Sequence, residues 1–363
     1  METVICEPLF RHLMKTHYVA FLLALIFAFS TTSLIIEEWS TNNIHDQTPE
    51  SHNLSIKQIE YQSQSRISGT NWNLHPGGIG SDEGIVTKIA PNGDLYVAGN
   101  VCHETSPCSA SFGSSTIYVK DDIFVARLDT NGNWKWVAYT NGSDSNAKAS
   151  LSDIEIDANG NVYVAGHFGN TKYWGSISKS SHPHTTVSGY TRCDASTQDG
   201  FVAKLDSNGT WDWVQTMRDC YEGYARGIAL DSNQNVYVVG ESKLEGGNAH
   251  GFELVVNFNG ASSSHDSIQS PCSSSNKRFH PWLAKYDSNG VVDWVDRLSD
   301  ECLDVWMRDV TTDSTDSAIV TGFYNEMNCW GGSCADTLSF HGLSVTNSNG
   351  RMDSFIAKVN STH

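Results

Sequence analysis

The chain has 363 residues, of which 39% are apolar and 10% aromatic, a composition that supports a packed core and excludes a largely disordered protein. Acidic residues outnumber basic ones by 41 to 23, so the formal net charge is −18 at pH 7. This charge repels nucleic-acid phosphates and anionic lipid headgroups, and we therefore expect no nucleic-acid partner.

The first predicted element is an apolar run at residues 18–36, preceded by Arg11 and Lys15 and followed by two glutamates. This order of charges directs the rest of the chain outward across a membrane. If translation begins at Met14, the run has the form of a cleaved signal peptide, whereas the longer segment is long enough for a membrane anchor. Both alternatives predict an extracellular or cell-surface protein that meets a membrane only through residues 1–36.

Residues 37–66 are polar, show no hydrophobic period and are predicted to form a flexible linker. Two phrases then recur through residues 67–360. The phrase Val-Tyr-Val-Ala-Gly stands at 162–166, with looser copies at 95–99, 236–240 and 318–322. The phrase Phe-Val-Ala-Arg-Leu-Asp stands at 124–129, with copies at 201–206, 282–287 and 355–359. Three of the latter lead through a turn into a Trp-bearing segment, with tryptophans at positions 134, 136, 211, 213 and 294.

These phrases alternate apolar and polar residues and end in Asp-x-Asn-Gly, which predicts strands joined by tight hairpin turns. In the second repeat the predicted strands A, B, C and D are residues 153–157, 162–168, 201–206 and 211–215. A four-stranded antiparallel unit buries both faces only when it stacks against others. The sequence therefore predicts an all-β fold, a β-propeller of four-stranded antiparallel blades.

The repeat resembles a known family. Asp-x-Asn-Gly-Asn-Val-Tyr-Val-Ala-Gly, an aromatic-Gly pair such as Phe112-Gly113 or Trp174-Gly175, and Asp-Gly-Phe-Val-Ala-Lys-Leu-Asp together look like the SBBP (β-propeller repeat) family of exported bacterial and archaeal proteins. The resemblance covers residues 67–360 and implies the fold, but that family has no shared activity. The long B-to-C excursions and the cysteines depart from its pattern.

The fourth repeat has strands near 310–312, 319–323 and 355–359, but no strand D follows before His363. Residues 70–74, Thr-Asn-Trp-Asn-Leu, resemble the strand D phrase. We predict that this N-terminal strand completes the last blade of a closed, monomeric four-bladed ring. An eight-bladed ring of two chains and an open arc are the alternatives.

Eight cysteines follow the export segment and are expected to be oxidised. Cys193 and Cys272 precede strand C while Cys220 and Cys302 follow strand D, so the repeat pairs 193 with 220 and 272 with 302. The other two bridges, Cys102–Cys108 and Cys329–Cys334, are predicted to close short loops after strand B.

The sequence contains no phosphate loop, nucleophile elbow, zinc-protease motif or metal-ligand set, and it predicts no catalytic residue, cofactor or metal. Strand A places Asp153 and Asp309, with Arg226 and Arg308 one residue earlier, at the mouth of the channel. A non-enzymatic binding module is favoured over a propeller-fold hydrolase or lyase and over a structural envelope component.

Strand order predicts which side binds. The A-to-B and C-to-D turns are short and lie on one side, whereas the long B-to-C loops, the D-to-A connections and all four bridges lie on the other. That long-loop side also collects aromatic residues outside the core pattern, which we predict to contact a protein or glycan ligand: Tyr221, Tyr224, Trp306 and Trp330.

Overall fold

The computed structural model divides the chain into two compact units, Met1–Gln64 and Ser65–His363. The structure describes residues 72–361 of the second unit, with gaps at 104–106, 143–146, 182–185, 188–189, 192–197, 219–221, 246–254, 259–266, 270–276, 299–302, 326–336, 341–342 and 347–351. The predicted signal or anchor segment and the linker at 37–66 lie outside this range. No helix among the described residues is long and apolar enough to cross a membrane.

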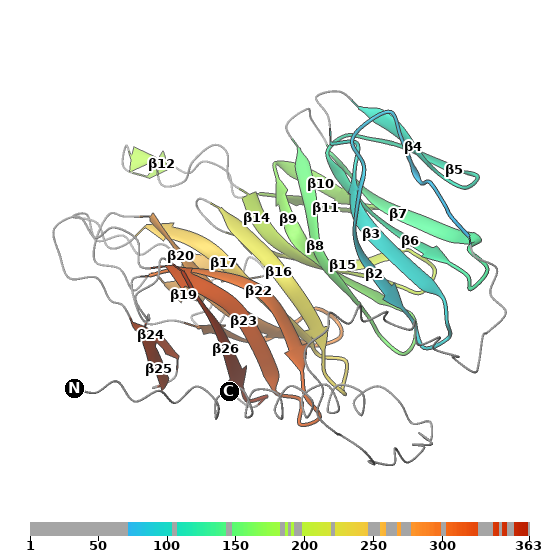
Figure 1. Cartoon of the computed structure of the whole chain (residues 1–363). Coiled ribbons are helices and arrows are strands. Elements are labelled where there is room, and N and C mark those ends of the chain that lie inside the picture. The colour runs from blue at the N-terminus through green and yellow to red at the C-terminus, as the bar shows by residue number, and fades with distance from the viewer. Residues whose placement is uncertain are drawn as a thin grey trace, which may run out of the picture. The chain divides into compact units, whose positions relative to one another are not determined.

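Each of the four sequence repeats forms an antiparallel sheet, here called repeat sheets one to four (Figure 1). As predicted, sheets one to three contain strands A, B, C and D in that order and sheet four contains A, B and C, and the all-β fold is confirmed. Sheet one has β2 (Glu83–Ile89), β3 (Leu95–Val101), β6 (Asp122–Leu128) and β7 (Trp134–Gly142), and sheet two has β8 (Lys148–Ile156), β9 (Val162–Gly169), β14 (Gln198–Leu205) and β15 (Trp211–Arg218). Sheet three has β16 (Gly223–Leu230), β17 (Val236–Glu245), β20 (Lys277–Tyr286) and β21 (Val292–Arg297), and sheet four has β22 (Asp304–Thr312), β23 (Ala318–Asn325) and β26 (Asp353–Val359).

The long B-to-C excursions contain hairpins that the sequence did not predict. They are β4 (Cys108–Phe112) with β5 (Ser115–Val119), β10 (Thr171–Trp174) with β11 (Ile177–Ser180), β12 (Thr186–Val187) with β13 (Tyr190–Thr191), β18 (Val255–Phe258) with β19 (Ser267–Gln269), and β24 (Thr337–Phe340) with β25 (Leu343–Thr346). Two of them join the preceding sheet, because β10 pairs with β7 and β18 pairs with β15. Repeat sheets one and two are therefore six-stranded and interlocked with the following repeat.

The apolar core lies between successive repeat sheets. One cluster of fully buried residues, including Val125 and Ile154, joins sheets one and two. A second, including Val202 and Ile228, joins sheets two and three, and a third, including Leu283 and Val320, joins sheets three and four. This radial stacking buries the faces that a single four-stranded sheet would leave exposed.

The Trp segments on strand D contact the neighbouring sheet. Trp136 packs on the C-to-D turn of sheet two, where a Cβ added to Gly209 would lie 2.6 Å from its ring, and Trp213 lies in the same way on Gly290. Both glycines have positive φ, +82° and +79°, which the turn requires.

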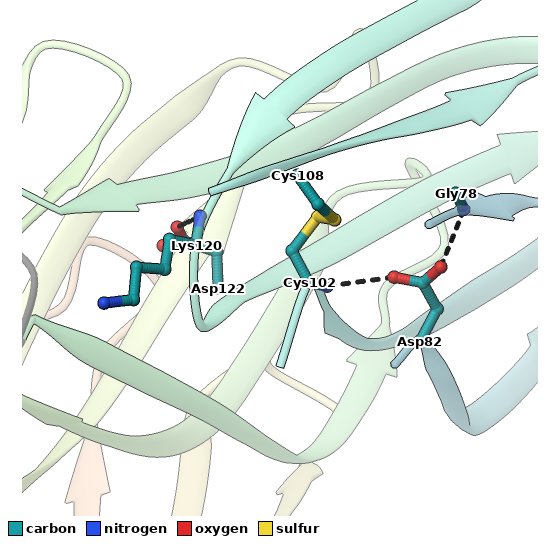
Figure 2. The surroundings of a disulfide bond; sticks show 6 residues. All are labelled: Gly78, Asp82, Cys102, Cys108, Lys120 and Asp122. Atoms are coloured by element: carbon teal, nitrogen blue, oxygen red, sulfur yellow. Dashed lines mark hydrogen bonds between the residues drawn. A yellow bond between two sulfur atoms is a disulfide. The ribbon is translucent and has the colours of Figure 1, made fainter. Parts of the chain in front are cut away.

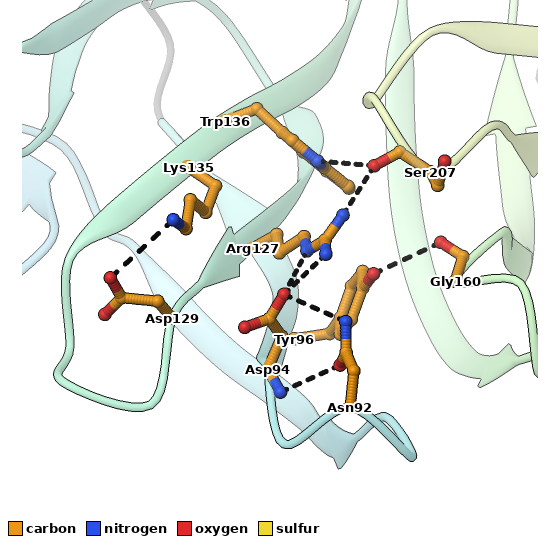
Figure 3. A network of polar contacts seen from close by, with 9 residues as sticks. All are labelled: Asn92, Asp94, Tyr96, Arg127, Asp129, Lys135, Trp136, Gly160 and Ser207. Carbon is orange, nitrogen blue, oxygen red and sulfur yellow. Dashed lines mark hydrogen bonds and ion pairs between the residues drawn. The ribbon is translucent and has the colours of Figure 1, made fainter.

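The turn side of the sheets is held by a repeated polar contact. In Figure 3, Arg127 of strand C and Trp136 of strand D both donate to the carbonyl oxygen of Ser207 in the next turn, at 2.8 and 3.1 Å. Lys204 and Trp213 donate to Ser288 in the same manner. The recurring basic residue of the second phrase therefore joins neighbouring sheets.

The turn aspartates cap their own turns. Oδ1 of Asp157 accepts the backbone N–H groups of Asn159 and Asn161, at 2.8 and 2.9 Å, and the aspartates of the other turns make the same contacts. This geometry accounts for Asp-x-Asn-Gly as a structural signature.

The segment from Trp72 to β1 (Gly77–Gly78) occupies the position of a strand D relative to sheet one. A Cβ on Gly132 would lie 2.8 Å from the Trp72 ring, the contact that Trp136 makes with Gly209. Moreover, β1 pairs with β4, the hairpin of repeat one, as β7 pairs with β10. Gly77 and Asn141 stand five residues after Trp72 and Trp136, so the two segments share one register.

Candidate functional site

Strand A, the inner strand of every repeat sheet, has a bulge at the same place. Register shifts fall between Gly84 and Val86 in β2, Leu151 and Asp153 in β8, Ala225 and Gly227 in β16, and Met307 and Asp309 in β22. The extra residues are Ile85, Ser152, Arg226 and Arg308. Bulges of this kind change the direction of side chains and recur beside functional sites.

The glycine that ends Val-Tyr-Val-Ala-Gly lies opposite each bulge. A Cβ on Gly166 would lie 2.3 Å from the carbonyl oxygen of Ser150, and one on Gly240 would lie 2.0 Å from that of Tyr224. Since the backbone of the inner strand occupies the space of a side chain, this position accepts only glycine without displacement. The glycine of the repeat phrase therefore makes room for the backbone of the inner strand at each bulge.

The four inner strands surround a cavity of ≈ 370 Å³, which we call the inner-strand cavity, and residues of each of them line it. The four residues predicted to lie at the channel mouth, Asp153, Arg226, Arg308 and Asp309, all line it. Additional polar lining comes from Lys88, Ser152, Glu155 and Thr311. The cavity therefore presents groups of both charges.

Among the acids that line the cavity, Asp153 is the one whose pKa is clearly shifted. Its carboxylate accepts the backbone N–H of Ile154 at 2.8 Å and, across the sheet boundary, that of Ile228 at 3.2 Å. Burial raises the pKa of Asp153 to about 6, although the Ile228 N–H and the charge of Lys88 oppose the shift. The group therefore lies close to its ionisation point at mildly acidic pH.

Arg226 and Arg308 occupy equivalent bulges on adjacent strands. Nε of Arg226 donates to Oε1 of the fully buried Glu241 at 2.7 Å, and Oε2 of Glu241 accepts the N–H of Met307 at 3.1 Å. Burial raises the pKa of Glu241, and Arg226 opposes that shift. Arg308 forms no hydrogen bond or ion pair with any residue that the structure describes, and its guanidinium lies 4.7 Å from the ring centre of Phe323.

A row of half-buried aromatic rings adjoins these arginines at the long-loop end of the strands. Tyr224 leads through Phe279 to Trp306, with ring centres 6.3 and 5.8 Å apart, and Trp306 stacks on Phe323 at 5.1 Å. Arg226 lies over Tyr224 at 4.3 Å. The structure thus brings together two of the predicted ligand contacts, Tyr224 and Trp306, while Tyr221 and Trp330 lie outside the described residues.

The Cys102–Cys108 disulfide is present as predicted, with Cα atoms 5.6 Å apart (Figure 2). Beside it, Asp82 accepts the N–H groups of Cys102 and Gly78 at 2.9 and 2.8 Å, which links the end of β3 to β1. The bridge therefore helps to place the outer hairpin β4–β5. The other three predicted bridges include cysteines outside the described residues and remain predictions.

Sequence reasoning missed Lys88 and Glu155, which form an ion pair of 2.8 Å between β2 and β8. The signal was available, because each stands three residues after the bulge residue of its strand, at an equivalent position of its repeat. Glu241 was also missed. It directly follows the recurring glycine of the third repeat phrase, where the other copies carry Asn100, His167 and Phe323, so the repeat does not mark it. Its contact with Arg226 became visible only in the structure.

An all-β chain of antiparallel repeat sheets stacked around a common cavity resembles a β-propeller in organisation. The chain is 22% identical over 276 residues to an uncharacterised WD repeat-containing protein of Acanthamoeba polyphaga mimivirus. That match covers 70% of this chain and 19% of the relative. No family model matches the chain, so membership of the SBBP family stays a prediction.

Proposed function

We propose that the chain is an exported, non-enzymatic β-propeller module that binds a protein or glycan partner on its long-loop side. One observation supports this choice of side above the others: the short turns are taken up by internal contacts, whereas the long-loop end carries the row Tyr224, Phe279, Trp306 and Phe323. Half-buried aromatic rings beside arginines are the residue types enriched in binding hot spots. Export rests on the apolar run at residues 18–36.

We expect substitution at this side to weaken partner binding without unfolding the chain. Trp306→Leu, which keeps apolar volume beside Phe323, and Trp330→Ala should each reduce the affinity for a partner found by glycan array or pull-down by at least about tenfold. Asn289→Ala on the turn side is the control and should leave affinity unchanged. Circular dichroism checks the fold. If Asn289→Ala abolishes binding and the tryptophan variants bind normally, the working side is assigned wrongly.

We further propose that the module is a monomeric four-bladed ring in which residues 70–74 supply the missing strand of repeat sheet four. Ile356 of β26 is 75% exposed, whereas the equivalent residues of the other sheets, Val125, Val202 and Leu283, are fully buried in the clusters between sheets. Closure of the ring would pack sheet one on this face of sheet four and cover Ile356, and the segment from Trp72, which has strand D contacts with sheet one, would lie beside β26. An uncovered edge strand would also invite aggregation.

The shared register predicts one specific cross-link. Val137 faces Ala126 in sheet one, so Asn73 should face Ala357 in sheet four. The double variant Asn73→Cys with Ala357→Cys is expected to form a new disulfide within one chain, detected by non-reducing peptide mapping. The control pair Ile79→Cys with Ala357→Cys should not cross-link. Residue 79 lies six residues beyond residue 73, which in an extended chain places it about 20 Å farther along the strand. A bridge between two chains would indicate the eight-bladed dimer, and no bridge would indicate an open arc; either result contradicts the proposal.

A further inference from the structure

The inner-strand cavity has a polar lining, unlike the aromatic row of the long-loop side. Its volume of ≈ 370 Å³ suits a molecule of one small ring or a short chain, and its lining is polar. We propose that this cavity binds a small carboxylate that also carries hydroxyl or ammonium groups, the shared chemistry of sugar acids and amino acids. The proposal does not depend on the partner of the long-loop side.

The arginines of the cavity supply the anion-binding half. The equivalent bulges place Arg226 and Arg308 on adjacent strands, and the strands approach closely at Gly227, where a Cβ would lie 2.9 Å from the Cα of Asp309. Tyr224 and Phe323 lie under the two guanidinium groups and orient them. Glu241 accepts a hydrogen bond only from Nε of Arg226. The terminal N–H groups of Arg226, and all N–H groups of Arg308, form no hydrogen bond with any described residue. The planar fork of a guanidinium matches a carboxylate.

The acids of the cavity supply the other half and limit the charge of the ligand. Asp309 uses one oxygen to accept the N–H of Val310 at 2.8 Å, and the second oxygen has no partner among the described residues. Asp153 has further acceptor capacity beyond its two backbone contacts. These acceptors require donors on the ligand. They also repel a doubly charged phosphate, which a chain of net charge −18 would disfavour in any case.

Isothermal titration of the full chain tests the proposal, with glucuronate, glutamate and glucose as probes at millimolar concentration. We expect glucuronate or glutamate to bind, which also separates the sugar-acid from the amino-acid source, and glucose not to bind because it lacks the carboxylate. Failure of both carboxylates to bind, or equal binding of glucose, would overturn the inference.

Two variants assign the binding to the named groups. Arg308→Gln should weaken carboxylate binding at least about tenfold, because a charge-assisted contact is lost, while Arg308→Lys should retain part of it. Asp309→Asn should weaken glutamate more than glucuronate, since the ammonium group depends more on a charged acceptor. Lys148→Gln removes a cation from an exposed position of β8 outside the cavity and is the control. Unchanged affinity in Arg308→Gln would show that any binding lies elsewhere.

Discussion

Replacing Lys172 with methionine is expected to lower the free energy of unfolding by about 3 to 5 kcal/mol, since the change leaves a buried carboxylate without its counter-charge. Lys172 of β10 and Asp122 at the start of β6 are both fully buried, with Nζ and Oδ1 2.5 Å apart. Thr140 also donates to Asp122, at 2.7 Å. Burial raises the pKa of Asp122, and the charge of Lys172 and its hydrogen bond oppose that shift. Urea unfolding followed by tryptophan fluorescence measures the loss.

A double variant separates the buried charge from the lost packing. Lys172→Met combined with Asp122→Asn removes both charges and should recover much of the stability, because no uncompensated ion remains. Lys179→Met, on the neighbouring strand β11, is the control for removal of a lysine. If Lys172→Met unfolds at the same urea concentration as the parent chain, the pair does not join repeat one to repeat two.

Replacing Gly240 with alanine is expected to lower the free energy of unfolding by about 3 kcal/mol or more, at the upper end for overpacked sites. The added Cβ would lie 2.0 Å from the carbonyl oxygen of Tyr224 and 2.3 Å from the ring of Trp282, which is fully buried. Neither group can move freely, since one is the backbone of an inner strand and the other is part of the core between sheets two and three. The thermal unfolding midpoint should fall accordingly.

Gly84 provides a matched control on the strand that faces this position in repeat one. A Cβ there meets nothing within 4 Å, and its φ is not in the left-handed region, so Gly84→Ala should change stability by less than about 0.5 kcal/mol. Equal losses in the two variants would mean that backbone flexibility, not the steric conflict at the bulge, determines the effect.

The repeat made the framework of this fold predictable. Strands B and C of repeat two were expected at 162–168 and 201–206 and are β9 (Val162–Gly169) and β14 (Gln198–Leu205), because alternation and Asp-Asn turns mark them. The inner strand was expected to begin at Asp153 but begins at Lys148. The bulge between Leu151 and Asp153 breaks the two-residue period there, so the pattern could be followed only from the bulge onward.

The exchange of hairpins between repeats was not predictable in the same way. The pairing of β10 with β7 joins residues of different repeats through three positions, and no local period specifies such a partner. The cavity was predictable in part. Asp153, Arg226, Arg308 and Asp309 were placed together by strand equivalence, whereas Glu241 contributes through a buried contact that arises only when the strands pack.

The hairpin exchange also bears on how such a chain can change its length in evolution. Strand D of repeats one and two is bordered by a hairpin encoded in the next repeat. A segment copied from the start of one of these inner strands to the start of the next therefore carries a hairpin for the preceding sheet and a strand D that needs the hairpin of the following repeat. Inserting one complete copy of repeat two would therefore keep the border on both sides. A copy cut within the excursion leaves one sheet without its hairpin. Selection on folding would thus favour whole-repeat duplication over partial duplication, which keeps the number of repeats an integer.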